Sequence, residues 1–300
     1  MRRLLLIVPM ALLVITLTWI LIRSAPGNFY TQEKKLPPAV EENIKKKYGL
    51  DKPIIQQYGI LMWNIVRGDF GESLKYEGQT VNEIIAYSLP YSATIGILAY
   101  LLALIVGLSA GIIAALKQNS AIDYGSMSLA MLGLSVPNFV VGPILVLIFS
   151  LWLYWFPPAR ISGVSSYVLP VITLSAIYAA YIARLTRAGM LEVLRSDYIR
   201  TARAKGLSET KVLLKHALRG GLIPVVSFTG PALAALLAGT VVVEKVFAIP
   251  GLGNIFIQSV LNRDEPLTLG IVAFLSVLVM IFNLLVDISY AFLDPRIRYD

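Results

Sequence analysis

The sequence predicts an all-α polytopic membrane protein, and three observations lead to that fold class. Apolar residues make up 57% of the 300-residue chain and charged residues only 15%, whereas soluble domains average about 45–50% and about 25%. The charged residues gather in stretches that separate long apolar runs. Six of these runs reach or approach the length of about 20 residues that a helix needs to cross a bilayer. We therefore expect six transmembrane helices.

The six expected helices differ in length and in how they end. In order they are Leu4–Ile22, Tyr91–Leu116, Gly125–Phe156, Val168–Ile182, Leu222–Val243 and Leu267–Leu293. The first has 19 uncharged residues followed directly by Arg23, which favours a retained helix over a cleaved signal peptide. The fourth is the shortest, and we expect it to continue as helix past Arg184 and Arg187. Asp287 is an ionisable residue inside the apolar sixth run, where such residues are rare. It is either a functional group or a residue that caps or pairs near the helix end.

The distribution of positive charge predicts the orientation of the helices. With the N-terminus inside, the internal short segments hold 14 Lys and Arg residues and the external short loops hold three. Lys and Arg collect in cytoplasmic loops, so this asymmetry places both termini in the cytoplasm. The same rule explains the net charge of +8 without a nucleic-acid partner. The expected localisation is a multi-pass protein of the cell membrane, embedded in lipid.

The chain divides into three regions: a first helix over 1–23, an external domain over 24–90 and a core over 91–300. Within the external domain we expect a helix over Pro37–Gly49 and an amphipathic helix over Gln56–Val66. Turns are expected at Gly68, Gly71 and Gly78. The domain has too few apolar residues for its own core, so it should pack on the membrane helices or on a partner.

A basic loop over 189–221 is the most informative part of the core. It holds seven Lys and Arg residues: Arg195, Arg200, Arg203, Lys205, Lys211, Lys215 and Arg219. We expect Asp197 to cap a helix of about two turns that ends at Lys205. Gly206 would supply the left-handed residue after it, with Leu207 packing back on Ala202.

The remainder of the basic loop predicts a second short helix and a docking surface. Ser208 would cap Glu209–Arg219, and Gly220-Gly221 would end it. Ala202 and Ala204 would keep one surface thin enough to enter a groove, and Arg200 and Arg203 would share a face. The alternative is a solvated basic loop that touches lipid head groups.

The sequence holds no recognisable catalytic constellation. It lacks the G-x-x-x-x-G-K-[ST] phosphate loop, the H-E-x-x-H metal motif and a carboxylate pair within a span. It has no cysteine and a single histidine, His216, so a Cys or His metal cluster cannot form. We therefore expect neither an enzyme nor a metal or other cofactor in this chain, and any energy source must lie in another subunit.

The basic loop resembles the EAA loop of ABC importer permeases, in the form of the dipeptide and oligopeptide permease family. Ala202 and Gly206 match the Ala and Gly of that motif, whereas Arg200 and Thr201 stand where the general motif has Glu and Ala. Five further motifs match in order: GDFGES at Gly68–Ser73, LSVPNF at Leu134–Phe139, EKVFAIPGLG at Glu244–Gly253, LNRDEP at Leu261–Pro266 and LDPRIRY at Leu293–Tyr299.

The resemblance implies a type I ABC importer permease fold and a set of partners. These are a second homologous permease, two cytoplasmic ATPase subunits that bind ATP and Mg, and an external solute-binding protein. The residues that would couple to the ATPase are Asp197, Tyr198, Arg200, Thr201, Ala202, Arg203, Lys205 and Gly206. The external gate and docking loop would include Glu244, Pro250, Gly251 and Gly253, with a re-entrant turn over 249–253.

The substrate and its path are the least constrained part of the prediction. Ser135, Asn138, Ser227 and Thr229 lie beside Pro137 or Gly230-Pro231, where helix kinks would line a hydrated passage; helix packing through small residues is the other interpretation. Peptide is the favoured substrate, with oligosaccharide or a nickel complex as alternatives. An ion-coupled carrier is opposed by the scarcity of charge within the spans, and an intramembrane enzyme by the lack of a nucleophile–base pair.

Overall fold

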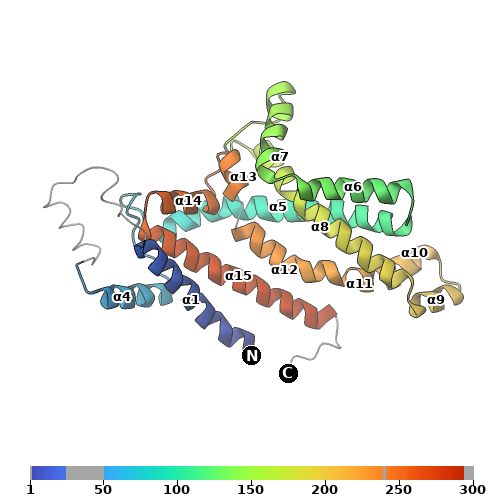
Figure 1. Ribbon diagram of the computed structural model, residues 1–300, viewed down its shortest axis with the longest axis horizontal. Coiled ribbons are helices and arrows are strands. Elements are labelled where there is room, and N and C mark those ends of the chain that lie inside the picture. The colour runs from blue at the N-terminus through green and yellow to red at the C-terminus, as the bar shows by residue number, and fades with distance from the viewer. Residues whose placement is uncertain (1, 25–50, 239–240, 294–300) are drawn as a thin grey trace. The chain divides into compact units, whose positions relative to one another are not determined.

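The computed structural model describes residues 2–24, 51–238 and 241–293, which are mostly helical (Figure 1). The elements are α1 (Arg2–Ser24), α4 (Ile54–Val66), α5 (Val81–Leu116), α6 (Ala121–Ser135), α7 (Asn138–Leu145), η1 (Val146–Trp152), η2 (Val164–Tyr167), α8 (Val168–Leu194), α9 (Asp197–Ala204), α10 (Glu209–Lys211), η3 (Val212–Ala217), α11 (Leu218–Gly221), α12 (Ile223–Ala238), α13 (Val241–Val246), α14 (Leu252–Leu261) and α15 (Glu265–Leu293). Backbone contacts group them into two units. Unit 1 holds 1–90 and 250–280, and unit 2 holds 91–249 and 281–300.

Three helices in the described residues are long and apolar enough to cross a membrane. They lie in Val81–Leu116, Val164–Leu194 and Glu265–Leu285, and a bent pair of helices would make a fourth span. The expected continuation of the fourth run is confirmed, because α8 remains helical to Leu194. The first and fifth runs are also helical, in α1 and α12. The count of six spans stays a prediction, and the side chain of Asp287 lies outside the described residues, as does the expected helix over 37–49.

The third expected helix is not continuous, which corrects the sequence prediction. It divides into α6 and the pair α7–η1, which meet at an angle of 102°. Between them Val136 is extended, with φ −94° and ψ 117°. The cause is Pro137, whose ring disfavours helical backbone at the residue before it and whose nitrogen cannot donate a hydrogen bond.

Unit 1 holds a compact apolar cluster at the start of α5. Val81 and Ile85 pack with Leu252 of α14 and Leu267 of α15. Helix α15 approaches closely because Gly270 has no side chain: an added Cβ would lie 2.5 Å from Val81 Cγ1. Phe70, Tyr76 and the first turns of α5 thus pack against 250–275, whereas the side chains of α4 take no part in this cluster. The three expected turn glycines, Gly68, Gly71 and Gly78, all have positive φ.

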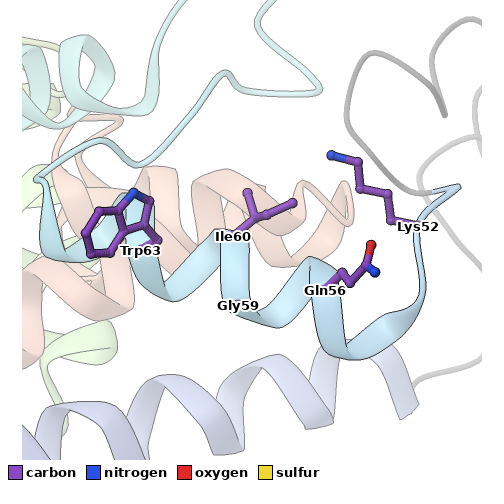
Figure 2. Close-up of a pocket in the computed structure, with 5 residues that line it drawn as sticks. All are labelled: Lys52, Gln56, Gly59, Ile60 and Trp63. Carbon is purple, nitrogen blue, oxygen red and sulfur yellow. The ribbon is translucent and has the colours of Figure 1, made fainter.

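Helix α4 in unit 1 contacts α1 and confirms the helix expected over Gln56–Val66. The hydroxyls of Tyr58 and Thr16 are 2.6 Å apart, and the rings of Tyr58 and Trp19 are 5.2 Å apart. Other side chains of α4, including Ile60 and Trp63, project away from α1 (Figure 2).

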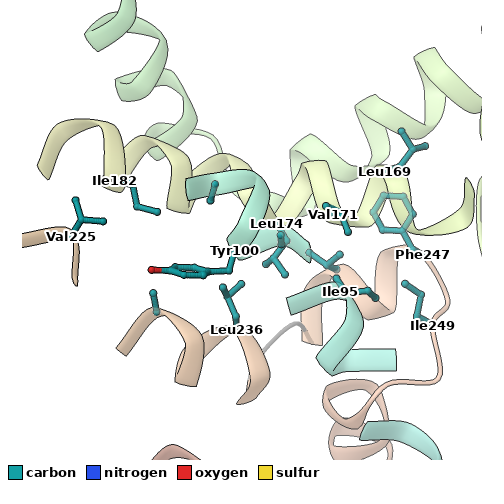
Figure 3. Close-up of a cluster of buried hydrophobic side chains, with 14 residues drawn as sticks. Ile95, Tyr100, Leu169, Val171, Leu174, Ile182, Val225, Leu236, Phe247 and Ile249 are labelled. Atoms are coloured by element: carbon teal, nitrogen blue, oxygen red, sulfur yellow. The ribbon is translucent and has the colours of Figure 1, made fainter. Parts of the chain in front are cut away.

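Unit 2 is built on a core shared by α5, α8, α12 and α13. Its buried residues include Ile95 and Tyr100 of α5, Ile182 of α8 and Leu236 of α12 (Figure 3). Helix α5 crosses α8 at two glycines, Gly107 and Gly111. A Cβ added at Gly107 would lie 2.7 Å from a backbone oxygen of α8, and a Cβ added at Gly111 would lie 2.5 Å from another. The structure thus shows helix packing through small residues at this crossing.

Candidate functional site

The centre of the basic loop is α9, an eight-residue helix about 12 Å long that follows α8 after a turn at Arg195 and Ser196. The expected cap at Asp197 is wrong, because Asp197 is the first helical residue. Ser196 occupies the cap position with extended backbone, and its hydroxyl donates to the Val193 carbonyl at 2.6 Å. Asp197 remains at the positive end of the helix dipole.

The C-terminal end of α9 confirms the conformation expected for Gly206. Gly206 has φ +75°, and its amide donates to the Arg203 carbonyl at 2.9 Å. The amide of Leu207 reaches the Ala202 carbonyl at 3.4 Å. These two bonds form a Schellman motif, which ends a helix sharply and sets the direction of the next one.

One face of α9 is buried and the opposite face is free. Ile199 and Ala202 are 0% and 5% exposed, and they pack with Met190, Val212 and Ala217. The exposed residues Asp197, Arg200, Thr201 and Ala204 are spaced by three or four, so they lie on one helix face. This corrects the expectation for Ala202: its small side chain fits α9 against its own chain, while Ala204 keeps the outer face thin.

The two arginines of α9 have partners within the loop. Arg203 binds both carboxylate oxygens of Glu209, at 2.8 and 3.2 Å, and so spans the turn between the two helices. Arg200 lies 3.4 Å from Asp197 on the outer face. Both pairs are exposed, and such pairs contribute little to stability. Arg200 is therefore the better placed of the two for a partner on the outer face.

The second helix of the loop runs through α10, η3 and α11 and ends at Gly221, two residues beyond the expected Arg219. The glycine pair therefore forms the end of this helix, as predicted. A Cβ at Gly220 would lie 2.9 Å from the Tyr198 hydroxyl, and a Cβ at Gly189 of α8 would lie 2.3 Å from the Gly221 carbonyl oxygen. The glycine pair allows close approach of α8, α9 and α11, and the loop is one packed unit.

A partly buried ion pair joins α6 to α8 ahead of this loop. Asp123 is 1% exposed and accepts from Arg187 Nε at 2.6 Å and Nη2 at 2.7 Å. The same carboxylate accepts from the Asn119 amide at 2.9 Å. The sequence did not predict this pair, although it indicated that the fourth helix continues past the charged residue Arg187.

Two of the motifs that carried the resemblance meet in unit 1. The hydroxyl of Ser73, in Gly68–Ser73, donates to Asp264 Oδ2, in Leu261–Pro266, at 2.5 Å. Asp264 is fully buried and also accepts from the Lys75 and Leu267 amides at 3.1 and 3.2 Å. Neither motif alone indicates this contact, which attaches the loop before α5 to the start of α15.

The residues expected at the external gate lie in different settings. Glu244 of α13 is fully buried, and its Oε1 accepts from the Ser92 hydroxyl at 2.7 Å. Gly251 precedes α14 with extended backbone, whereas Gly253 is buried inside α14. The expected turn over 249–253 is therefore shorter than predicted, because helix resumes at Leu252.

The four pathway candidates occupy two separate segments. Ser135 and Asn138 flank the break between α6 and α7, and Asn138 Oδ1 is buried without a hydrogen-bond partner among the described residues. Ser227 and Thr229 lie on α12, which stays helical through Pro231. Thr229 accepts from the Tyr100 hydroxyl at 2.5 Å. In the described parts of the chain, no hydrogen bond joins the two segments.

The long apolar helices define a membrane protein of helical fold, and comparison with known proteins identifies its family. The family model described as "Binding-protein-dependent transport system inner membrane component" matches residues 107–299. The chain belongs to this family, as a multi-pass transport subunit of the membrane.

Individual relatives extend this likeness over nearly the whole chain. The chain is 45% identical over 300 residues to the oligopeptide transport system permease protein OppB of Haemophilus influenzae, covering 99% of this chain and 98% of that one. It is 44% identical over 287 residues to the dipeptide transport system permease protein DppB of Bacillus subtilis, covering 96% and 93%.

The fold itself is similar to that of a solved transporter. A chain of the MetNI methionine ABC transporter, in an inward-facing conformation, matches with a TM-score of 0.60 and 16% identity. The match covers 70% of this chain and 96% of that chain. At this identity the likeness shows a common fold and carries no information on substrate.

Proposed function

We propose that this chain is the membrane subunit of an ATP-driven peptide importer, and that it forms half of the translocation pathway. The observation that carries the proposal is α9, a helix anchored on one face by Ile199 and Ala202 and free on the other. A rigid, exposed helix is suited to receive force from a partner. The relatives named as oligopeptide and dipeptide permeases, at 44–45% identity over almost the full chain, support peptide as the substrate.

The partners of the proposed complex are a second homologous permease, two cytoplasmic ATPases and an external solute-binding protein. ATP and Mg belong to the ATPase subunits, since this sequence lacks the phosphate loop. In the proposed orientation both termini and the basic loop are cytoplasmic, which the 14 to three asymmetry of positive charge supports.

Coupling follows from how α9 is attached. Its buried face packs with Met190 of α8 and Val212 of η3, so a displacement of α9 must move these helices with it. Helix α8 is continuous over 27 residues and carries that displacement into the membrane core. The Asp123–Arg187 pair extends the rigid body to α6. Closure of the ATPase subunits would thus reach the transport pathway as a rigid-body movement.

The proposal is tested by uptake into proteoliposomes that contain the permeases, the ATPases and the binding protein. Internal ATP should drive uptake of labelled peptide, and ionophores that collapse ion gradients should leave that uptake unchanged. Uptake that requires an ion gradient and does not depend on ATP would contradict the ATP-driven importer and support the ion-coupled carrier. ATP-driven uptake of oligosaccharide or a nickel complex instead of peptide would support the ATP-driven mechanism but contradict peptide as the substrate.

A further inference from the structure

Helix α4 is apolar and is not covered by the rest of the described chain. Its 13 residues are uncharged, and none of them is buried. Ile55 and Val66 are 85% and 73% exposed. At 1.5 Å per residue the helix is about 20 Å long, too short to cross the hydrocarbon core of about 30 Å. An exposed apolar helix of this length needs an apolar environment of another kind.

The contact between α4 and α1 indicates how deep α4 lies. Tyr58 shares a hydrogen bond with Thr16 of α1 at 2.6 Å. Thr16 precedes Arg23, the charged residue that closes the apolar run of α1, by seven positions, or about 10 Å along the helix. With α1 as the expected first transmembrane helix, this position places Tyr58 at the depth of the hydrocarbon. The two hydroxyls form a hydrogen bond with each other there, and polar groups within a bilayer need such a partner because no water is available.

The exposed surface of α1 on either side of this contact is also apolar. Leu13, Leu17 and Leu21 are 53%, 52% and 69% exposed. Helix α4 thus contacts the expected first transmembrane helix, whose outer residues suit lipid, and its own exposed residues are apolar like those of α1. This likeness favours lipid as the occupant of the exposed face of α4.

The residues around α4 have the polarity of a helix lying at a membrane surface. Asp51 and Lys52 precede it and Arg67 follows it, so the charges stand at its two ends. The Arg67 guanidinium lies 4.4 Å from the centre of the Trp63 ring. Amphipathic aromatic and basic side chains of this kind collect at head-group level. Between the ends, a shallow depression of about 460 Å³ is lined by Lys52, Gln56, Gly59, Ile60 and Trp63 (Figure 2).

We infer that α4 is embedded in one leaflet of the membrane, with lipid acyl chains covering its exposed face. The inference goes beyond the proposed transport function and depends on neither the substrate nor the orientation of the chain. In the proposed orientation the leaflet is the external one. Embedded in this way, α4 anchors the loop that follows it, which the Ser73–Asp264 hydrogen bond ties to the start of α15.

The absence of cysteine from the chain makes a direct test possible. Single cysteines would replace Ile55 or Ile60, and each would carry a spin label in the full transporter in liposomes. Leu17→Cys on α1 provides the lipid reference, and Glu77→Cys, in an exposed turn, provides the aqueous reference. Both α4 labels should collide with oxygen more than with a water-soluble nickel chelate. Their depth should be about 5–10 Å below the head groups.

Two results would overturn the inference. Nickel accessibility equal to that at Glu77 would place α4 in water. Exclusion of both reagents would mean that protein covers the face, either the second permease or the binding protein, and addition of the binding protein would separate these two. ATP-driven uptake by the labelled transporters is recorded separately, so that failure of the transport proposal is distinguishable from failure of this one.

Discussion

The conformation of Gly206 determines the shape of the basic loop, because it sets the turn between α9 and the helix that follows. Its φ of +75° is disfavoured by any Cβ, and nothing else lies within 4 Å of the place a Cβ would take, so the cost of substitution comes from the backbone alone. We expect Gly206→Val to cost about 1 kcal/mol or more and to uncouple transport. Gly206→Asn is the matched control, because Asn tolerates this conformation.

The measurement for Gly206 is peptide uptake together with retention of the ATPase subunits on purification. The valine variant should insert in the membrane and lose uptake or lose the ATPase subunits, whereas the asparagine variant should keep most of both. Equal, wild-type behaviour of the two would show that α9 is an ordinary solvated loop.

The two arginines of α9 are expected to differ in function. Because Arg203 already binds Glu209, Arg203→Glu should impair uptake by repelling Glu209, and the exchange Arg203→Glu with Glu209→Arg should restore it. Arg200→Glu reverses the charge on the free face and should abolish ATPase retention. If the Arg200→Glu transporter retained its ATPase subunits as the wild type does, docking on that face would be contradicted. If the double exchange failed to restore uptake, Arg203 itself would contact the partner.

At the scale of elements, the crossing of α5 and α8 depends on glycine. A Cβ at Gly111 would lie 2.5 Å from the Ala183 carbonyl oxygen, so Gly111→Ala should separate the helices and cost about 1–3 kcal/mol. Gly125→Ala in α6 is the control, since nothing lies within 4 Å of that position. Thermal unfolding of the detergent-solubilised complex should show a lower Tm for the first variant only. An unchanged Tm for Gly111→Ala would contradict the observed crossing.

The ion pair between α6 and α8 makes a second prediction at this scale. Asp123→Ala leaves the guanidinium of Arg187, which is 28% exposed, without its carboxylate, and the loss of these charged hydrogen bonds should cost about 1.5–3 kcal/mol. Arg195→Ala, which loses only an exposed bond to Gln118, should change stability by less than about 0.5 kcal/mol. Unfolding temperatures of the two purified variants test this difference, and similar values would show that the pair is not a structural link.

At the scale of the whole molecule, the proposed orientation is open to direct labelling. Single cysteines at Glu77 and Ser208 are both exposed, and they lie on opposite sides of the membrane in this orientation. In intact cells an impermeant maleimide should label Glu77→Cys, while Ser208→Cys should react only after the cells are opened. Labelling of both positions from the same side would reject the proposed topology.

The sequence by itself determined the helical fold class, most helix locations and the turn at Gly206 in the basic loop. These properties are local: an apolar run of sufficient length for a helix, and a glycine at the position after α9 that needs positive φ. The continuation of α8 to Leu194 and the turn at Gly206 were accordingly predicted correctly. Resemblance along the whole chain added the family.

Only the tertiary structure decided which surfaces are free and which residues meet. Burial of Ala202 against Val212 left Asp197, Arg200, Thr201 and Ala204 as the outer face of α9. Gly220-Gly221, predicted only as a helix end, proved also to be a close contact. Ser73 and Asp264, 191 residues apart, proved to be hydrogen-bond partners. Such outcomes depend on packing between residues remote in sequence, and a local pattern carries no information about which distant side chain will occupy the neighbouring space.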